Sequence, residues 1–160
     1  PEGEAGTGAG GGLRAAAALL LAAIAAVGLT APAAAAPYKG KTEGGSTIRF
    51  DRRGNQLKGM RTVVPTVCLE TTGGYDSRAG GEIFRPPRAV LGRKVKSKAL
   101  QPAAMNRGIE ATKSYTVEAK RAGKRVKGRL SLSYSFLIPD LYGSKVYVCS
   151  GSTTFTAGPR

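Results

Sequence analysis

The chain of 160 residues contains no histidine and no tryptophan, and only two cysteines and two methionines. Histidine is the most common general base and the most common metal ligand in proteins. Its absence therefore excludes Ser-His-Asp triads and the usual histidine-containing zinc sites. The composition predicts a protein that is not an enzyme and that uses no cofactor or metal.

Acidic residues are also scarce, with 10 Asp and Glu against 25 Lys and Arg. A hydrolase that works with paired carboxylates would have to draw on Glu70, Asp76 and Glu82. These three residues surround the stretch Glu70–Gly81, whose Gly, Thr, Ser and Asp content predicts a surface loop. Acids on loops are usually solvated, and the chain has no tryptophan on which a sugar could stack, so a hydrolase is the least favoured class.

Residues 1–36 contain the parts of a secretory signal peptide behind a Gly-rich leader. Arg14 is the positive charge, Ala15–Leu29 is the apolar block, and a run of small residues follows, with cleavage predicted after Ala35. The alternative is an uncleaved membrane anchor formed by residues 15–36, which carry no charge. The segment predicts export, to a secreted or cell-envelope location.

Residues 37–160 are predicted to form a single secreted domain, which keeps 24 basic and 8 acidic side chains and so has a net charge of +16. Its clearest pattern is the stretch Arg125–Ile138, in which apolar and polar residues alternate. Successive side chains of a strand point to opposite faces, so this stretch is predicted to be a half-buried strand. The inward residues are expected to be Val126, Gly128, Leu130, Leu132, Tyr134, Phe136 and Ile138.

Shorter alternating stretches separated by turn residues occur along the rest of the domain. Among them are a hairpin of Ser46–Asp51 with Gln56–Met60, and a β-rich stretch Arg61–Leu69 in which Pro65 favours an edge or a bulge. About seven to eight strands joined by hairpins, with almost no helical periodicity, predict an all-β fold. We expect an antiparallel β-sandwich or a small open barrel with one disulfide.

The strand Ile109–Lys120 is expected to pair with Arg125–Ile138 through an even-length turn. A turn centred on Ala122 and Gly123 would set Ala119 opposite Val126 and Tyr115 opposite Leu130. In this register both apolar faces agree, and Glu118 lies opposite Lys127.

Cys68 and Cys149 both fall in predicted strands of a chain that is expected to be exported. A disulfide between them is predicted, and enclosing about 80 residues it would stabilise the fold by roughly 4 to 5 kcal/mol in the chain-entropy model. The alternatives are two buried free thiols, or a metal site that would lack two further ligands.

Basic residues gather in two clusters that together are predicted to bind polyanions. The first cluster is Lys120, Arg121, Lys124, Arg125, Lys127 and Arg129, and the second is Lys94, Lys96 and Lys98. No aromatic residues are interleaved with the outward charges, so specific nucleic-acid recognition by base stacking is not predicted. The competing interpretation is that these lysines and arginines only keep the protein soluble and protect exposed strand edges.

The domain carries a series of short motifs, which in order along the chain are Tyr38–Thr42, Ile48–Phe50, Cys68, Leu130–Tyr134, Cys149–Gly151 and Phe155–Ala157. In these motifs it resembles small secreted β-proteins of high-GC Gram-positive bacteria. The resemblance implies an all-β fold and export, and it implies no active site. The leading hypothesis is a non-enzymatic exported or cell-envelope domain that contacts anionic cell-wall polymers. A secreted protein-binding or inhibitor module, using Glu70–Gly81 or Arg85–Arg88, is the main alternative.

Overall fold

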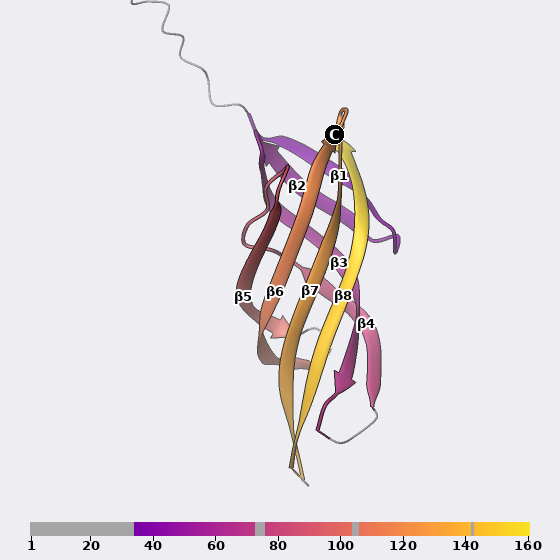
Figure 1. Ribbon diagram of the computed structural model, residues 1–160, viewed down its shortest axis with the longest axis vertical. Coiled ribbons are helices and arrows are strands. Elements are labelled where there is room, and N and C mark those ends of the chain that lie inside the picture. Colours follow the sequence, from indigo (N-terminus) through magenta and orange to yellow (C-terminus); the bar gives the residue numbers. More distant parts are fainter. Residues whose placement is uncertain (1–33, 73–75, 104–105, 142) are drawn as a thin grey trace, which may run out of the picture. The chain divides into compact units, whose positions relative to one another are not determined.

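The computed structural model describes residues 34–72, 76–103, 106–141 and 143–160, all within the compact unit Ala34–Arg160. This described part of the chain contains eight strands (Figure 1). They are β1 (Ala36–Thr42), β2 (Thr47–Arg53), β3 (Gln56–Glu70), β4 (Ser77–Phe84), β5 (Lys94–Ala103), β6 (Asn106–Ala122), β7 (Arg125–Asp140) and β8 (Gly143–Pro159). The predicted leader and signal peptide lie outside the described residues except for residues 34–36.

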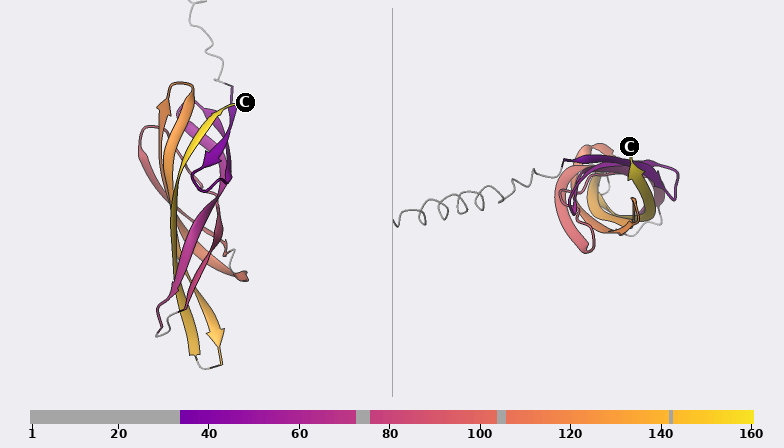
Figure 2. Two further views of the ribbon diagram at one scale, coloured as in Figure 1. Left: turned by 90° about the vertical axis from the view of Figure 1, so that its right-hand side faces the viewer. Right: turned by 90° about the horizontal axis from the view of Figure 1, so that it is seen from above.

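All eight strands belong to one antiparallel sheet with the order β4-β3-β2-β1-β8-β7-β6-β5. The first half of β3 pairs with β2, whereas Val67–Glu70 at its end pair with β8. Because β3 pairs with both β2 and β8, the sheet curls around a common interior, as the end-on view shows (Figure 2). The prediction of an antiparallel all-β fold is confirmed, and the open barrel is the alternative that describes this single curled sheet.

Hydrogen bonds outside the strand ladders connect the two halves of the sheet near its edge strands, β4 and β5. Gln101 on β5 donates a hydrogen bond from Nε2 to the carbonyl of Arg85, just after β4, over 3.2 Å. The segment Ala89–Gly92 connects β3 with β6: its first carbonyl accepts the N–H of Leu57 at 3.0 Å, and its last N–H donates to the carbonyl of Ala119 at 2.8 Å. These bonds tie together elements from the two halves of the curled sheet.

Burial along β7 and β8 follows the predicted period of two. The buried residues are Val126, Leu130, Leu132, Tyr134 and Phe136 on β7, and Tyr147, Cys149, Thr153, Phe155 and Ala157 on β8. Intervening residues such as Lys127 and Ser133 are exposed. The inward aromatic rings pack face to face, with the centroids of Phe136 and Tyr147 5.4 Å apart. The predicted core face is therefore confirmed.

The β6–β7 hairpin has the predicted even turn but a different register. Its turn is Gly123-Lys124, and the φ of 61° at Gly123 suits a tight hairpin turn. Centring the turn one residue later shifts every pair by two, so Tyr115 lies opposite Leu132 and not Leu130. The predicted pairs were wrong, but a shift of two keeps the apolar faces together, which is why sequence parity did not reveal it.

β3 is one unbroken strand, not the two strands predicted for residues 56–60 and 61–69. Pro65 lies between the last pairing with β2, at Arg61, and the first pairing with β8, at Val67. On the side of β3 that faces β2 and β8, no described strand pairs with residues 62–66, so a proline without an N–H breaks no ladder hydrogen bond there. The predicted loop Glu70–Gly81 was wrong in its second half, because Ser77–Gly81 belong to β4 and pair with β3.

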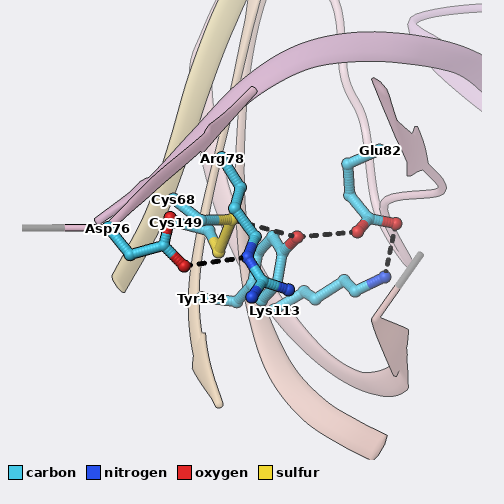
Figure 3. Close-up of a disulfide and its surroundings, with 7 residues drawn as sticks. All are labelled: Cys68, Asp76, Arg78, Glu82, Lys113, Tyr134 and Cys149. Carbon is cyan, nitrogen blue, oxygen red and sulfur yellow. Dashed lines mark hydrogen bonds and ion pairs between the residues drawn. A yellow bond between two sulfur atoms is a disulfide. The ribbon is translucent and has the colours of Figure 1, made fainter. Parts of the chain in front are cut away.

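Cys68 and Cys149 form the predicted disulfide, across 81 positions of sequence (Figure 3). They are directly paired residues of β3 and β8, and both are fully buried. The bond therefore lies where β3 has left β2 and joined β8. It covalently holds the pairing that makes the sheet curl.

Gly128 on β7 has no space for a side chain, and this predicts an effect on stability. A Cβ there would lie 2.7 Å from Cε1 of Phe155 and would clash with the carbonyl oxygen of Glu118. We expect Gly128→Ala to lower the free energy of unfolding by about 1 to 3 kcal/mol, measured by urea denaturation. Gly158→Ala is the matched control, because nothing lies within 4 Å of its Cβ. Equal stability of the two variants would contradict this packing.

Candidate functional site

The nine basic residues singled out from the sequence lie on three neighbouring strands and one turn. They are Lys94, Lys96 and Lys98 on β5, Lys120 and Arg121 on β6, Lys124 in the turn, and Arg125, Lys127 and Arg129 on β7. All nine are exposed. Because β5, β6 and β7 are consecutive in the sheet, the two sequence clusters form one surface.

Strand register places like charges directly opposite each other on this surface. Lys120 on β6 pairs with Lys127 on β7, and the row continues through Thr156 on β8 to Lys41 on β1. Neighbouring strands are only about 4.8 Å apart, so the two lysines repel each other. A direct pair of like charges destabilises a sheet, and it is relieved when an anion lies between them.

The adjacent row contains the acidic residue of this surface. Lys94, Glu118 and Arg129 lie side by side on β5, β6 and β7. The ammonium of Lys94 is 2.7 Å from a carboxylate oxygen of Glu118, and this hydrogen bond holds the pKa of Glu118 below its ordinary value. Glu118 is therefore ionised and offsets Lys94, while the guanidinium of Arg129 is exposed beside it.

A groove of about 390 Å³ runs between these rows. Its charged lining is Arg93, Lys94, Lys120, Lys127, Arg129 and Glu118, and its remaining lining is Gly92, Ala119 and Gly128. We call this the basic groove. With five cations and one carboxylate, it is a surface depression that attracts anions.

Not all predicted members reach the basic groove. Arg121 lies on the inward parity, opposite Val126, and its Nε donates to the carbonyl of Gly123 over 2.9 Å. Lys96 and Lys98 lie further along β5. There the outer face carries the hydroxyl groups of Ser114, Thr116, Ser131, Ser133, Ser150 and Ser152 around a depression of about 340 Å³.

Lys41 was not among the basic residues singled out from the sequence. In the structure Tyr38 and Thr42 are buried and Lys41 is exposed on β1. The signal that could have identified Lys41 is a short alternation along β1, in which Lys39 and Lys41 are exposed while Tyr38 and Thr42 are buried.

Protection of strand edges does not account for the basic groove. It explains Lys94, Lys96 and Lys98, because β5 is an edge of the sheet. Lys120, Lys127 and Arg129, however, lie on β6 and β7, which are paired on both sides. These interior positions need no such protection.

The three acids proposed for a hydrolase do not share one loop. Glu82 lies on β4 and is buried, whereas the sequence predicted a solvated acid. Asp76 accepts hydrogen bonds from Tyr147 and Arg78, which lower its pKa. Glu70 lies 3.7 Å from the ammonium of Lys145. Each acid thus has its own partners, so the geometry does not favour paired-carboxylate chemistry.

Glu82 forms a buried ion pair with Lys113 of β6 (Figure 3). Nζ and Oε1 are 2.8 Å apart, and both side chains are only 1% exposed. Oε2 of Glu82 accepts the hydroxyl of Tyr134 at 2.8 Å, and Nζ of Lys113 also donates to the carbonyl of Pro102. Burial and the hydrogen bond to Glu82 raise the pKa of Tyr134. We call these three residues the interior ion pair and its tyrosine.

This cluster links β4 with β6 and β7 across the interior. Its two charges have hydrogen-bonding partners and are closed to solvent, which suits a structural tie better than a reacting group. Nearby, burial and then the charge of Glu82 raise the pKa of Tyr115 to about 12. The sequence held a signal for the pair, since Lys113 shares the parity of Tyr115 and Glu82 shares that of Phe84.

Comparison with protein-family models, with curated proteins and with solved structures returns no match for this chain. Among the described residues, no group of three or more His, Cys, Asp and Glu side chains is placed to hold a metal ion. The same residues include no helix with the length and apolarity needed to span a membrane.

The interior ion pair predicts strong energetic coupling. Glu82→Leu or Lys113→Met alone leaves a buried charge without its partner, and we expect each to cost about 3 to 5 kcal/mol of unfolding free energy. The double variant removes both charges and should cost much less than the sum. Urea denaturation of all four proteins at pH 7 measures the coupling.

The exposed pair Lys94–Glu118 provides the control cycle for this prediction. Lys94→Met and Glu118→Leu should couple by no more than about 1 kcal/mol, as exposed pairs do. Additive costs in the Glu82–Lys113 cycle would contradict the interpretation of that pair as one buried unit.

Proposed function

We propose that the protein is a non-enzymatic exported or cell-envelope domain that binds anionic polymers through the basic groove. The observation that supports this most is the direct opposition of Lys120 and Lys127 on strands that are not edges. Repulsion between them lowers stability in the free protein, and an anion seated between them removes that cost. A solubilising role alone would be served equally well by charges placed apart.

The chemistry of the groove suits repeated phosphate or carboxylate groups. Arg93 and Arg129 can each bind an oxyanion with two parallel hydrogen bonds, and the lysines act as point charges. Every aromatic side chain in the described part of the chain is buried, which leaves none there for stacking bases. The proposed partner is therefore an acidic polysaccharide or a phosphate polymer of the cell wall, bound without base-specific contacts.

Export is part of the proposal. The Cys68–Cys149 disulfide is typical of an oxidising compartment outside the cytosol, and residues 1–36 have the pattern of a signal peptide. Anchoring by residues 15–36 is the alternative. In either case the basic groove would face anionic envelope polymers.

A secreted protein-binding module is the second candidate. Pro86, Pro87 and Arg88 line a groove of about 310 Å³ together with the start of β3. Exposed proline and arginine in a depression suit contact with another protein. Variants of this segment therefore distinguish the two candidates.

The test of polyanion binding uses two variants that change net charge equally. Lys120→Glu with Lys127→Glu alters the basic groove, and Arg85→Glu with Arg88→Glu alters exposed residues near β4. We expect the groove variant to bind immobilised inorganic polyphosphate at least about tenfold more weakly at 150 mM salt, because it loses two phosphate contacts. The slope of log affinity against log salt should also become shallower.

The Arg85/Arg88 variant should keep most of the polyphosphate affinity, while both variants should elute equally early from a sulfonate cation exchanger, which responds to net charge. If the two variants lose polyphosphate affinity equally, the groove is not the binding site. Retention on isolated cell envelopes, measured with the same pair, then relates the result to the native polymer.

A further inference from the structure

A second depression lies on the same face of the sheet as the basic groove, and its described lining is uncharged. Its volume is about 340 Å³, and three neighbouring strands, β6, β7 and β8, form it (Figure 1). Besides Leu132 and Gly151, the lining residues all carry a hydroxyl group. They are Ser114, Thr116, Ser131, Ser133, Ser150 and Ser152. We call these six residues the hydroxyl rows.

The strand register arranges the hydroxyl rows as two lines across the sheet. The first line is Ser114, Ser133 and Ser150, and the second is Thr116, Ser131 and Ser152. Each line ends at a lysine on β5, because Lys98 pairs with Ser114 and Lys96 pairs with Thr116. The two lysines of β5 that do not reach the basic groove therefore lie beside the hydroxyl rows.

The hydroxyl rows continue the basic groove along the strands. Thr116 is two positions before Glu118 on β6, and Ser131 is two positions after Arg129 on β7. Residues two positions apart point to the same face of a sheet, about 6.6 Å from each other. From Lys120 to the far hydroxyl line the path covers six residues of β6, or about 20 Å. The two depressions thus form one elongated surface.

The hydroxyl groups of these rows are available to a ligand. Ser133, Ser150 and Ser152 are exposed, and the other three residues are half-buried. In the part of the chain that the structure describes, none of the six side chains forms a hydrogen bond with another protein group. Strands favour β-branched and aromatic residues, and serine is not among them. Strand formation alone therefore does not account for five serines on this face.

The combination of charge and hydroxyl groups indicates the chemistry of the ligand. Lys96 and Lys98 are exposed and add a cation to each hydroxyl line. A serine hydroxyl both donates and accepts hydrogen bonds, so it can pair with the hydroxyl groups of a sugar. An acidic polysaccharide carries anionic groups and free hydroxyl groups together, whereas inorganic polyphosphate has no sugar hydroxyl groups.

We propose that the hydroxyl rows are a second part of the binding site, and that the ligand is an acidic polysaccharide lying along β6 and β7. The basic groove binds anionic groups of this polymer, and the hydroxyl rows exchange hydrogen bonds with its sugar hydroxyl groups. Lys96 and Lys98 bind acidic groups on the β5 side. This inference rests on the proposed function, because the same polymer occupies the basic groove.

The test compares binding of polygalacturonate, an acidic polysaccharide, with binding of inorganic polyphosphate. We expect Ser131→Ala with Ser133→Ala to bind polygalacturonate at least about fivefold more weakly, because hydrogen bonds to the sugar are lost. Its polyphosphate affinity should stay within about twofold of that of the native protein, because no charge is removed. Ser77→Ala with Ser144→Ala is the matched control. Both of these serines are exposed on strands and line neither depression, so both affinities should be kept.

A change to the ligand gives a second readout that needs no variant. Acetylated polygalacturonate keeps its carboxylates, but its hydroxyl groups are blocked and cannot donate hydrogen bonds. The native protein should bind it at least about fivefold more weakly than the free polymer. The Ser131→Ala, Ser133→Ala variant should bind the two forms about equally, because it lacks the partner groups.

Lys120→Glu with Lys127→Glu separates this inference from the proposed function. If that variant weakens binding of both polymers while Ser131→Ala with Ser133→Ala weakens neither, the proposed function stands and the hydroxyl rows are not part of the site. Equal losses of polyphosphate and polygalacturonate affinity in the serine variant also overturn the inference. If the lysine variant binds both polymers as tightly as the native protein, the proposed function itself fails, and this inference fails with it.

Discussion

The change of partner along β3 is the constraint on which the rest of the structure depends. β3 pairs with β2, β4 and β8. Along one side its partner changes from β2 to β8, and this change curls the sheet around a single core. The disulfide between Cys68 and Cys149 lies in the β3–β8 pairing. Gly151 on β8 allows the carbonyl of Pro65 to come so close that a Cβ would clash with it. The disulfide and the absence of a side chain at Gly151 thus both support the contact between β3 and β8.

The interior ion pair holds the structure together on the side where the sheet does not close. β4 and β5 form no ladder with each other, so contact between the halves depends on side chains. Glu82 reaches Lys113 and Tyr134 from β4, which ties an edge strand to two strands on the far side of the core. Buried pairs often add little net stability, but their geometry disfavours alternative packings. Here that geometry specifies which side of β4 faces the core.

Residue parity explains what could be predicted from sequence. The inward faces of β7 and β8 followed from alternation alone, because each strand has one wet side and one packed side. Parity determines register only to within multiples of two, so the position of the β6–β7 turn was missed. The continuity of β3 was missed because Pro65 looked like an interruption, and its tolerance depends on distant strands. Charges at apolar parity, Glu82 and Lys113, were the overlooked signal of a buried pair.

Strand register also explains why the sequence predicted only part of the basic groove. Cross-strand neighbours determine which charges converge, and Arg121 was grouped with residues from which its parity separates it. Lys41 joins the row of Lys120 and Lys127 only through β8, which pairs with both β7 and β1. A sheet in which like charges meet on interior strands distributes its electrostatic cost unevenly. The cost is concentrated at Lys120 and Lys127, where an anion would relieve a repulsion that the strand register imposes.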